Sequence, residues 1–124
     1  MNIRDTLEEA RDSLMYCKEL QIRLKTYEDF ATNSRKRDYD ETAIEMADKH
    51  RELNEEIAEM LRRADRAEAL IDRLRKPQQK AIMKAVFISG LSIRQAAQEM
   101  YYTERWAGQL IREGIRELEK MTAA

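Results

Sequence analysis

An unbroken alternation of three- and four-residue steps between apolar positions constrains this chain more than any other feature of its sequence. It predicts a helix over about residues 41–75 with one continuous seam. A period of 3.5 residues held over more than about four heptads keeps that seam against a partner helix, which is typical of a coiled coil. The seam positions are Ala43, Met46, His50, Leu53, Ile57, Met60, Ala64, Ala67, Ile71 and Leu74.

A second seam predicts the partner, a helix over about residues 4–30. Its positions are Ile3, Leu7, Ala10, Leu14, Cys17 and Leu24, with polar Gln21 interrupting the pattern. Residues 31–40 are polar, which predicts a loop. Folding the first helix back on the second would make residues 1–75 an antiparallel helical hairpin. A homodimer through the same seam is the competing arrangement, and the periodicity does not choose between them.

The composition favours an all-α protein without a membrane segment. Charged residues make up 38% of the chain, there are only 3 Gly and 1 Pro, and alternating β-branched runs are almost absent. Cys17 is the single cysteine, which excludes an intrachain disulfide and fits a reducing cytoplasm. No segment resembles a signal peptide or approaches the roughly 20 apolar residues of a membrane span. We therefore expect a cytoplasmic protein.

Pro77 marks the start of a second unit, residues 76–124, predicted to contain three short helices. Pro77 disfavours helical geometry at the preceding residue and can open the next helix, which we expect to end at Gly90. Ser92 with Gln95 three residues later predicts a capping box for the second helix, and Thr103 can cap the third. Residues 92–118 then read as a helix-turn-helix.

The exposed face expected for the last helix points to double-stranded DNA. Residues 76–124 carry eight Lys and Arg against five Asp and Glu, whereas residues 1–75 carry 15 against 19, so the positive charge lies with this unit. Arginine and glutamine side chains are donors suited to phosphates and base edges. The candidate DNA-binding residues are Arg94, Thr103, Arg105, Trp106, Gln109, Arg112 and Arg116. Trp106 lies between the polar and apolar faces of this helix, so it could either pack against the core or contact DNA.

Several features bear on this interpretation. Tyr101 occupies the turn position that often holds glycine, so a left-handed backbone there would be strained and a different turn shape is an alternative. Glu104 would repel phosphate. The Arg35–Arg37 run is a candidate phosphate contact, although charged loops are usually just solvated. We expect no catalytic residues, metal site or cofactor, because His50 stands alone and no nucleophile has a neighbouring base.

Residues 70–119 resemble region 4 of bacterial sigma factors, and more closely the sigma-like phage and prophage transcriptional regulators of the RinA/ArpU type. The shared motifs are the entry at Leu74–Pro77, the apolar helix Ala81–Ile88, the Gly90–Ser92 step, the pair Ala96-Ala97, and Tyr102-Thr103. Although the pair of small residues is shared, the sequence differs from the residue types usual in this family at Ala96, and also at Gly108 and Gly114. The resemblance implies a phage or prophage transcriptional regulator that binds promoter DNA, with RNA polymerase as a second candidate partner.

Two alternatives remain at this point. The chain could be a coiled-coil adaptor whose C-terminal helices bind protein and not DNA. It could also be the small subunit of a phage terminase, although such subunits usually place their DNA-binding part before the coiled coil.

Overall fold

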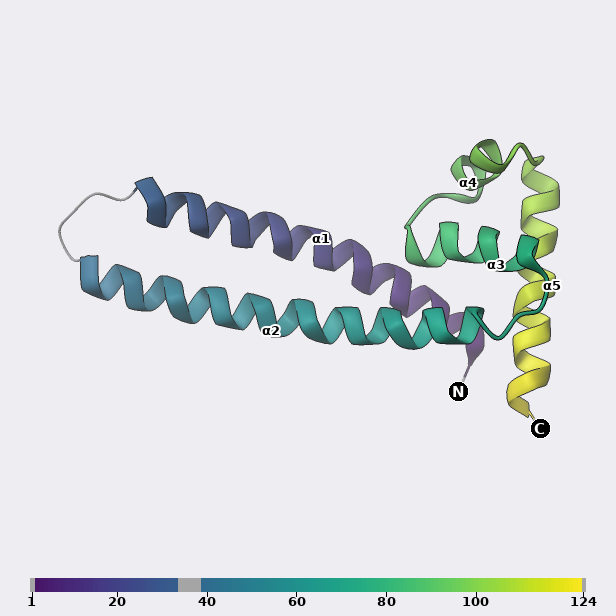
Figure 1. The fold of residues 1–124 in the computed structure, drawn as a ribbon, viewed down its shortest axis with the longest axis horizontal. Coiled ribbons are helices and arrows are strands. Elements are labelled where there is room, and N and C mark those ends of the chain that lie inside the picture. Colours follow the sequence, from purple (N-terminus) through teal and green to yellow (C-terminus); the bar gives the residue numbers. More distant parts are fainter. Residues whose placement is uncertain (1, 34–38, 124) are drawn as a thin grey trace.

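The computed structural model describes the backbone of residues 2–33 and 39–123, and within these ranges the chain is helical with no strand. The all-α prediction is confirmed for this part of the chain. Two long helices lie side by side and antiparallel, and four shorter helical segments pack across the end of this pair that holds the N-terminus (Figure 1). The last helix crosses that end, so the C-terminus also lies near the N-terminus.

The hairpin consists of α1 (Ile3–Asn33) and α2 (Tyr39–Ile71). Asn2 caps α1, since its Oδ1 accepts a hydrogen bond from the backbone N–H of Asp5 at 3.3 Å. Both helices extend into the segment predicted as a loop, so that prediction was wrong for residues 31–33 and 39–40. The Arg35–Arg37 run lies outside the described residues.

The seam of α1 differs from the predicted one at a single step. Leu20 is fully buried, whereas Gln21 is exposed. The interruption expected at Gln21 is therefore wrong, because the step after Cys17 is three residues long and brings Leu20 into the interface. Ser13, one turn before Cys17, is buried as well, so buried residues follow one another along this helix from Ile3 to Leu20.

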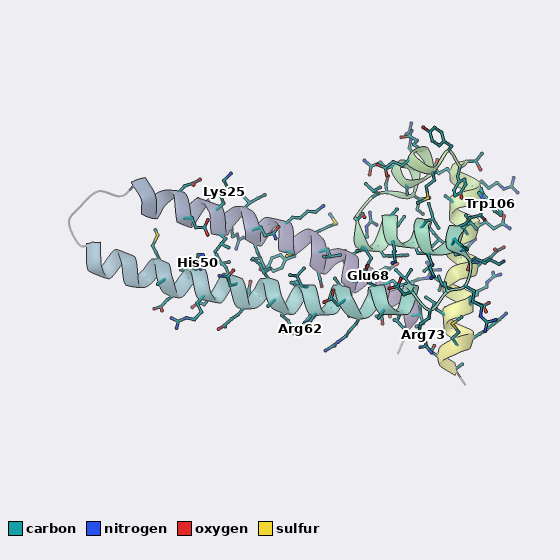
Figure 2. All side chains as sticks on the ribbon, in the orientation of Figure 1. Lys25, His50, Arg62, Glu68, Arg73 and Trp106 are labelled. Carbon is teal, nitrogen blue, oxygen red and sulfur yellow. The ribbon has the colours of Figure 1, made fainter. Side chains whose placement is uncertain are left out.

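His50 contributes a polar contact between the two hairpin helices. Its Nε2 lies 3.1 Å from Glu28 Oε1 on α1, and its Nδ1 lies 3.0 Å from Asn54 Nδ2, one turn further along α2 (Figure 2). A polar pair at a seam position disfavours other registers of the same two helices. His50 thus links the helices in this alignment.

The second helix ends four residues earlier than predicted, at Ile71 and not Arg75. The chain tightens after it, with the N–H of Arg73 bonded to Leu70 and that of Leu74 bonded to Ile71. Leu74 remains buried although it is no longer helical. Pro77 therefore opens the next helix after a connection of five residues, 72–76, and not directly after α2.

The connection is held by an ion pair across it. Lys84 Nζ lies 2.6 Å from Asp72 Oδ1 and 3.7 Å from a Glu68 carboxylate oxygen. The hydrogen bond to Asp72 is the main cause that raises the pKa of Lys84 above its ordinary value.

Residues predicted as one helix over 77–89 form two segments with different winding. The helix α3 (Pro77–Met83) continues into a wider π-helical turn, η1 (Lys84–Ile88), in which the N–H of Ser89 donates to Lys84 O at 2.9 Å. The wide turn buries three consecutive residues, Ala85, Val86 and Phe87. Ala81, the first residue of the apolar stretch Ala81–Ile88, is exposed.

Gly90 ends this segment as predicted, in the left-handed region with φ 77°. The following helices are α4 (Ile93–Met100) and α5 (Glu104–Ala123).

One hydrophobic core joins the base of the hairpin to the C-terminal helices. It runs from Ile3 and Leu7 of α1 and Ala67 and Ile71 of α2 to side chains of every C-terminal segment, ending at Leu118 of α5. The described residues include no helix long and apolar enough to cross a membrane.

Candidate nucleic-acid interface

Helix α4 begins with the predicted capping box. The backbone N–H of Gln95 donates to Ser92 Oγ at 3.1 Å, and the backbone N–H of Ser92 donates to Gln95 Oε1 at 3.0 Å. Two N–H groups that the helix itself cannot satisfy are thereby paired. The cap fixes where α4 starts, only two residues after the left-handed Gly90.

The turn after α4 adopts the left-handed backbone that the sequence made doubtful. Tyr101 has φ 58° and ψ 35°, and it is the one non-glycine residue with positive φ in the described chain. The N–H of Tyr102 bonds to Ala97 O at 2.9 Å and that of Tyr101 to Gln98 O at 3.3 Å, which is a Schellman ending. The turn therefore has the short shape that glycine usually permits, with a tyrosine in its place.

Thr103 then starts α5, because its Oγ1 accepts the backbone N–H of Trp106 at 3.1 Å. This confirms Thr103 as the N-cap of α5, and its hydroxyl oxygen is used in that cap. The two helices meet through small residues, since Ala96, Ala97 and Ala107 are all buried. Small side chains at a crossing let two helix axes approach closely at a steep angle.

The exposed face of α5 holds the predicted arginines together. Arg105, Gln109, Arg112 and Arg116 are all exposed, and at 3.6 residues per turn they fall within an arc of about 60°. We call these four residues the basic face. The opposite side of the helix is buried, at Ala107, Leu110, Ile111, Gly114, Ile115 and Leu118.

In the part of the chain that the structure describes, the arginines of the basic face are unpaired, whereas several arginines of the hairpin form ion pairs. On the hairpin, most described ion pairs join cations to carboxylates one turn away, as in Arg23–Glu19, Arg62–Glu59 and Arg51–Asp48. Within the described residues, neither Arg94 nor any arginine of the basic face makes an ion pair of this kind. Their guanidinium groups are thus available to an anionic partner.

Gln109 is more constrained than expected, whereas Trp106 keeps both of its predicted roles open. Gln109 Nε2 donates to Glu113 Oε1 at 3.1 Å, so part of its hydrogen-bonding capacity is used within α5. Trp106 is 39% exposed at the end of α5 near α4 (Figure 2), which leaves its indole both packed and accessible. Arg94 lies in the first turn of α4 and is exposed.

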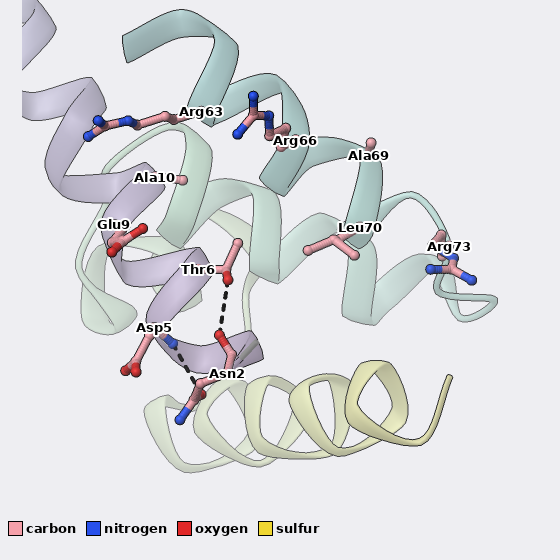
Figure 3. Close-up of a pocket in the computed structure, with 10 residues that line it drawn as sticks. All are labelled: Asn2, Asp5, Thr6, Glu9, Ala10, Arg63, Arg66, Ala69, Leu70 and Arg73. Carbon is pink, nitrogen blue, oxygen red and sulfur yellow. Dashed lines mark hydrogen bonds between the residues drawn. The ribbon is translucent and has the colours of Figure 1, made fainter. Parts of the chain in front are cut away.

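A separate groove of about 640 Å³ lies at the base of the hairpin between α1 and α2 (Figure 3). Asp5 and Glu9 line it from α1, whereas Arg63, Arg66 and Arg73 line it from the other side. Among the described residues, no group of three or more His, Cys, Asp or Glu side chains is placed to hold a metal ion. Cys17 is buried in the hairpin interface.

Comparison with known families assigns most of the chain to one family. A family model described as "Protein of unknown function (DUF1492)" matches residues 20–119. The chain belongs to this family. The match begins in α1 and ends in α5, so hairpin and C-terminal helices occur together in the family pattern. No curated protein and no solved structure matched the chain.

Proposed function

We propose that this protein is a sequence-specific DNA-binding transcriptional regulator whose α5 enters the major groove. The observation that carries the proposal is the basic face, with arginines on one side of a helix that a buried core holds from the other side. An α-helix fits the major groove of B-DNA, and arginine is the side chain that most often reads guanine there. Arg94 on α4 is suited to contact an adjacent phosphate.

The electrostatic arrangement supports the same function. Because acidic residues outnumber basic ones over residues 1–75, the excess of positive charge lies on residues 76–124. The resemblance to sigma-like phage regulators agrees with this. It extends the proposal to phage or prophage promoters in a bacterial cytoplasm.

The hairpin is the proposed contact surface for a second protein, with RNA polymerase as the candidate. It carries exposed apolar side chains, Met15, Ile22 and Leu61, on helices that are otherwise highly charged. Since Leu53, Ala64, Ala67 and Ile71 of the α2 seam are already buried, a homodimer would have to use exposed or half-buried residues or open the hairpin. Homodimerisation stays a prediction.

Charge-removing variants on α5 test the proposal against the adaptor alternative, in which the C-terminal helices do not bind DNA. We expect Arg105→Gln and Arg112→Gln each to weaken binding to host and phage promoter fragments, measured by fluorescence anisotropy at several salt concentrations. Loss of a base contact should cost about 1–3 kcal/mol on the preferred sequence, whereas loss of a phosphate contact should weaken all sequences alike. Arg62→Gln on the hairpin is the matched control. Equal binding by the α5 variants and the control would contradict the proposal.

A further inference from the structure

A second cluster of cations lies beyond the basic face, where the C-terminal half of α5 faces the connection after α2. It lines a cleft of about 360 Å³. The cationic side chains of the cleft are Arg75 and Lys76 from the connection, and Arg116 and Lys120 from α5. Arg116 belongs to both surfaces, so the cleft continues the basic face along the helix.

A buried glutamine lines the same cleft without a protein partner. Gln79 is only 4% exposed, and its side chain makes no hydrogen bond within the described residues. The amide atoms of Gln79 keep some contact with the solvent of the cleft, because among the described residues only Nε of Arg11 is fully buried without a partner. Its neighbours Ile82 and Met83 are apolar and buried, so the position would otherwise suit an apolar side chain. The amide N–H groups of Gln79 are donors for a ligand oxygen.

The charge of the lining selects an anion. Four cations face two carboxylates, Glu113 and Glu117. Glu113 already accepts a hydrogen bond from Gln109 at 3.1 Å. None of the four cations forms an ion pair within the described part of the chain. Guanidinium and ammonium groups together with an amide donor match the oxygens of a phosphate.

The position along α5 favours the DNA backbone as the source of that phosphate. Arg116 follows Arg105 by 11 residues, which is about 16 Å along a helix. The major groove is only about 12 Å wide, so a helix that reads bases near its N-terminus carries its C-terminal half out to the sugar–phosphate backbone.

From these observations we infer that the cleft binds one phosphate group, and that in the DNA complex this is a backbone phosphate flanking the base pairs contacted by Arg105 and Arg112. The assignment to DNA rests on the proposed function, whereas phosphate binding in the cleft does not. An occupied cleft would tie the connection after α2 to α5. It would thereby fix the hairpin relative to the DNA.

Nuclear magnetic resonance of the full chain tests the cleft directly. Inorganic phosphate, compared with chloride at equal ionic strength, should shift the side-chain amide resonances of Gln79 in a saturable way. Gln79→Met should weaken saturable binding, followed on the backbone amide resonances around the cleft, and should leave the thermal midpoint close to that of the natural chain, because the Gln79 side chain makes no hydrogen bond within the described residues. Gln78→Met changes the neighbouring exposed glutamine and is the matched control. A structural role for Gln79 would instead lower the midpoint.

Salt-dependent DNA binding distinguishes the source of the phosphate. Lys120→Gln should reduce the slope of log affinity against log salt by about one unit on every sequence, whereas Lys25→Gln, far out on α1, should not. A phosphate response with no DNA binding by the natural chain would support the site but overturn the DNA source and the proposed function. DNA binding with no phosphate response and no effect of Lys120→Gln would overturn the inference and leave the proposed function standing.

Discussion

Replacing Gly114 by alanine should reveal how closely α5 packs on the helix beneath it. A Cβ at this position would overlap the Sδ atom of Met83 and lie 3.6 Å from Leu74 Cδ1. Met83 is fully buried, so its side chain has little room to move. Overpacking of this kind costs about 1–3 kcal/mol, while alanine gains about 1 kcal/mol over glycine inside a helix. The free energy of unfolding should therefore fall by about 1 kcal/mol in Gly114→Ala.

The same substitution should change sign once Met83 is shortened. In a Met83→Ala background the overlap is gone, so Gly114→Ala should raise the free energy of unfolding by about 1 kcal/mol. The double-mutant cycle thus has an expected coupling of about 1–3 kcal/mol, measured by urea denaturation followed by circular dichroism. Gly108→Ala is the matched control in the same helix, since its Cβ would approach only the Nη1 of Arg112, at 3.4 Å. Additive effects of Gly114→Ala in both backgrounds would refute the packing argument.

Three further predictions address the turn, the basic face and the connection. Tyr101→Gly should raise the free energy of unfolding by about 1 kcal/mol, because glycine adopts the left-handed backbone without the steric cost that tyrosine has. Tyr101 is 96% exposed, so the substitution removes little packing. An unchanged urea midpoint would argue against backbone strain at this residue. Gly108→Ala should stabilise α5 and weaken DNA binding, because the added methyl group would hold the backbone away from the DNA. Equal DNA affinity of this variant and the natural chain in fluorescence anisotropy would show that the backbone does not approach the DNA at this residue. The pKa of Lys84 is raised mainly by its hydrogen bond to Asp72. The ion pair therefore stabilises the folded state fully at pH values below the pKa of an unfolded lysine, about 10.4. This stabilisation is lost as the pH rises through the higher pKa of the folded state. In Lys84→Met the urea midpoint should therefore fall less steeply at alkaline pH.

The long-range periodicity of the sequence predicted the hairpin well, and its errors have local causes. Leu20 was missed because a strict 3.5-residue register leads to Gln21, while the helix itself can take a three-residue step instead. The end of α2 was placed too late because Pro77 restricts only the residue before it. Nothing in the residues 72–75 themselves signals that the chain leaves the helix at Ile71.

The candidate interface was predictable where caps and helical spacing determine it, as at Ser92, Thr103 and Arg105. The π-helical turn was not, since it depends on how Phe87 fits a core assembled from both units. Gln79 was also missed, because a glutamine next to a proline reads as a solvated helix start. Its burial follows only from the packing of α5 over α3, which no local pattern reports.

Selection of DNA by the natural protein tests the central claim most directly. The full chain should be mixed with fragmented genomic duplexes from a bacterial host and its prophages, and the retained fragments sequenced and re-measured across a range of salt concentrations. We predict enrichment of a shared sequence, with an affinity that falls steeply as salt rises. Recovery of no common sequence, together with affinity for duplex DNA no greater than that of a variant lacking Arg105 and Arg112, would contradict the account.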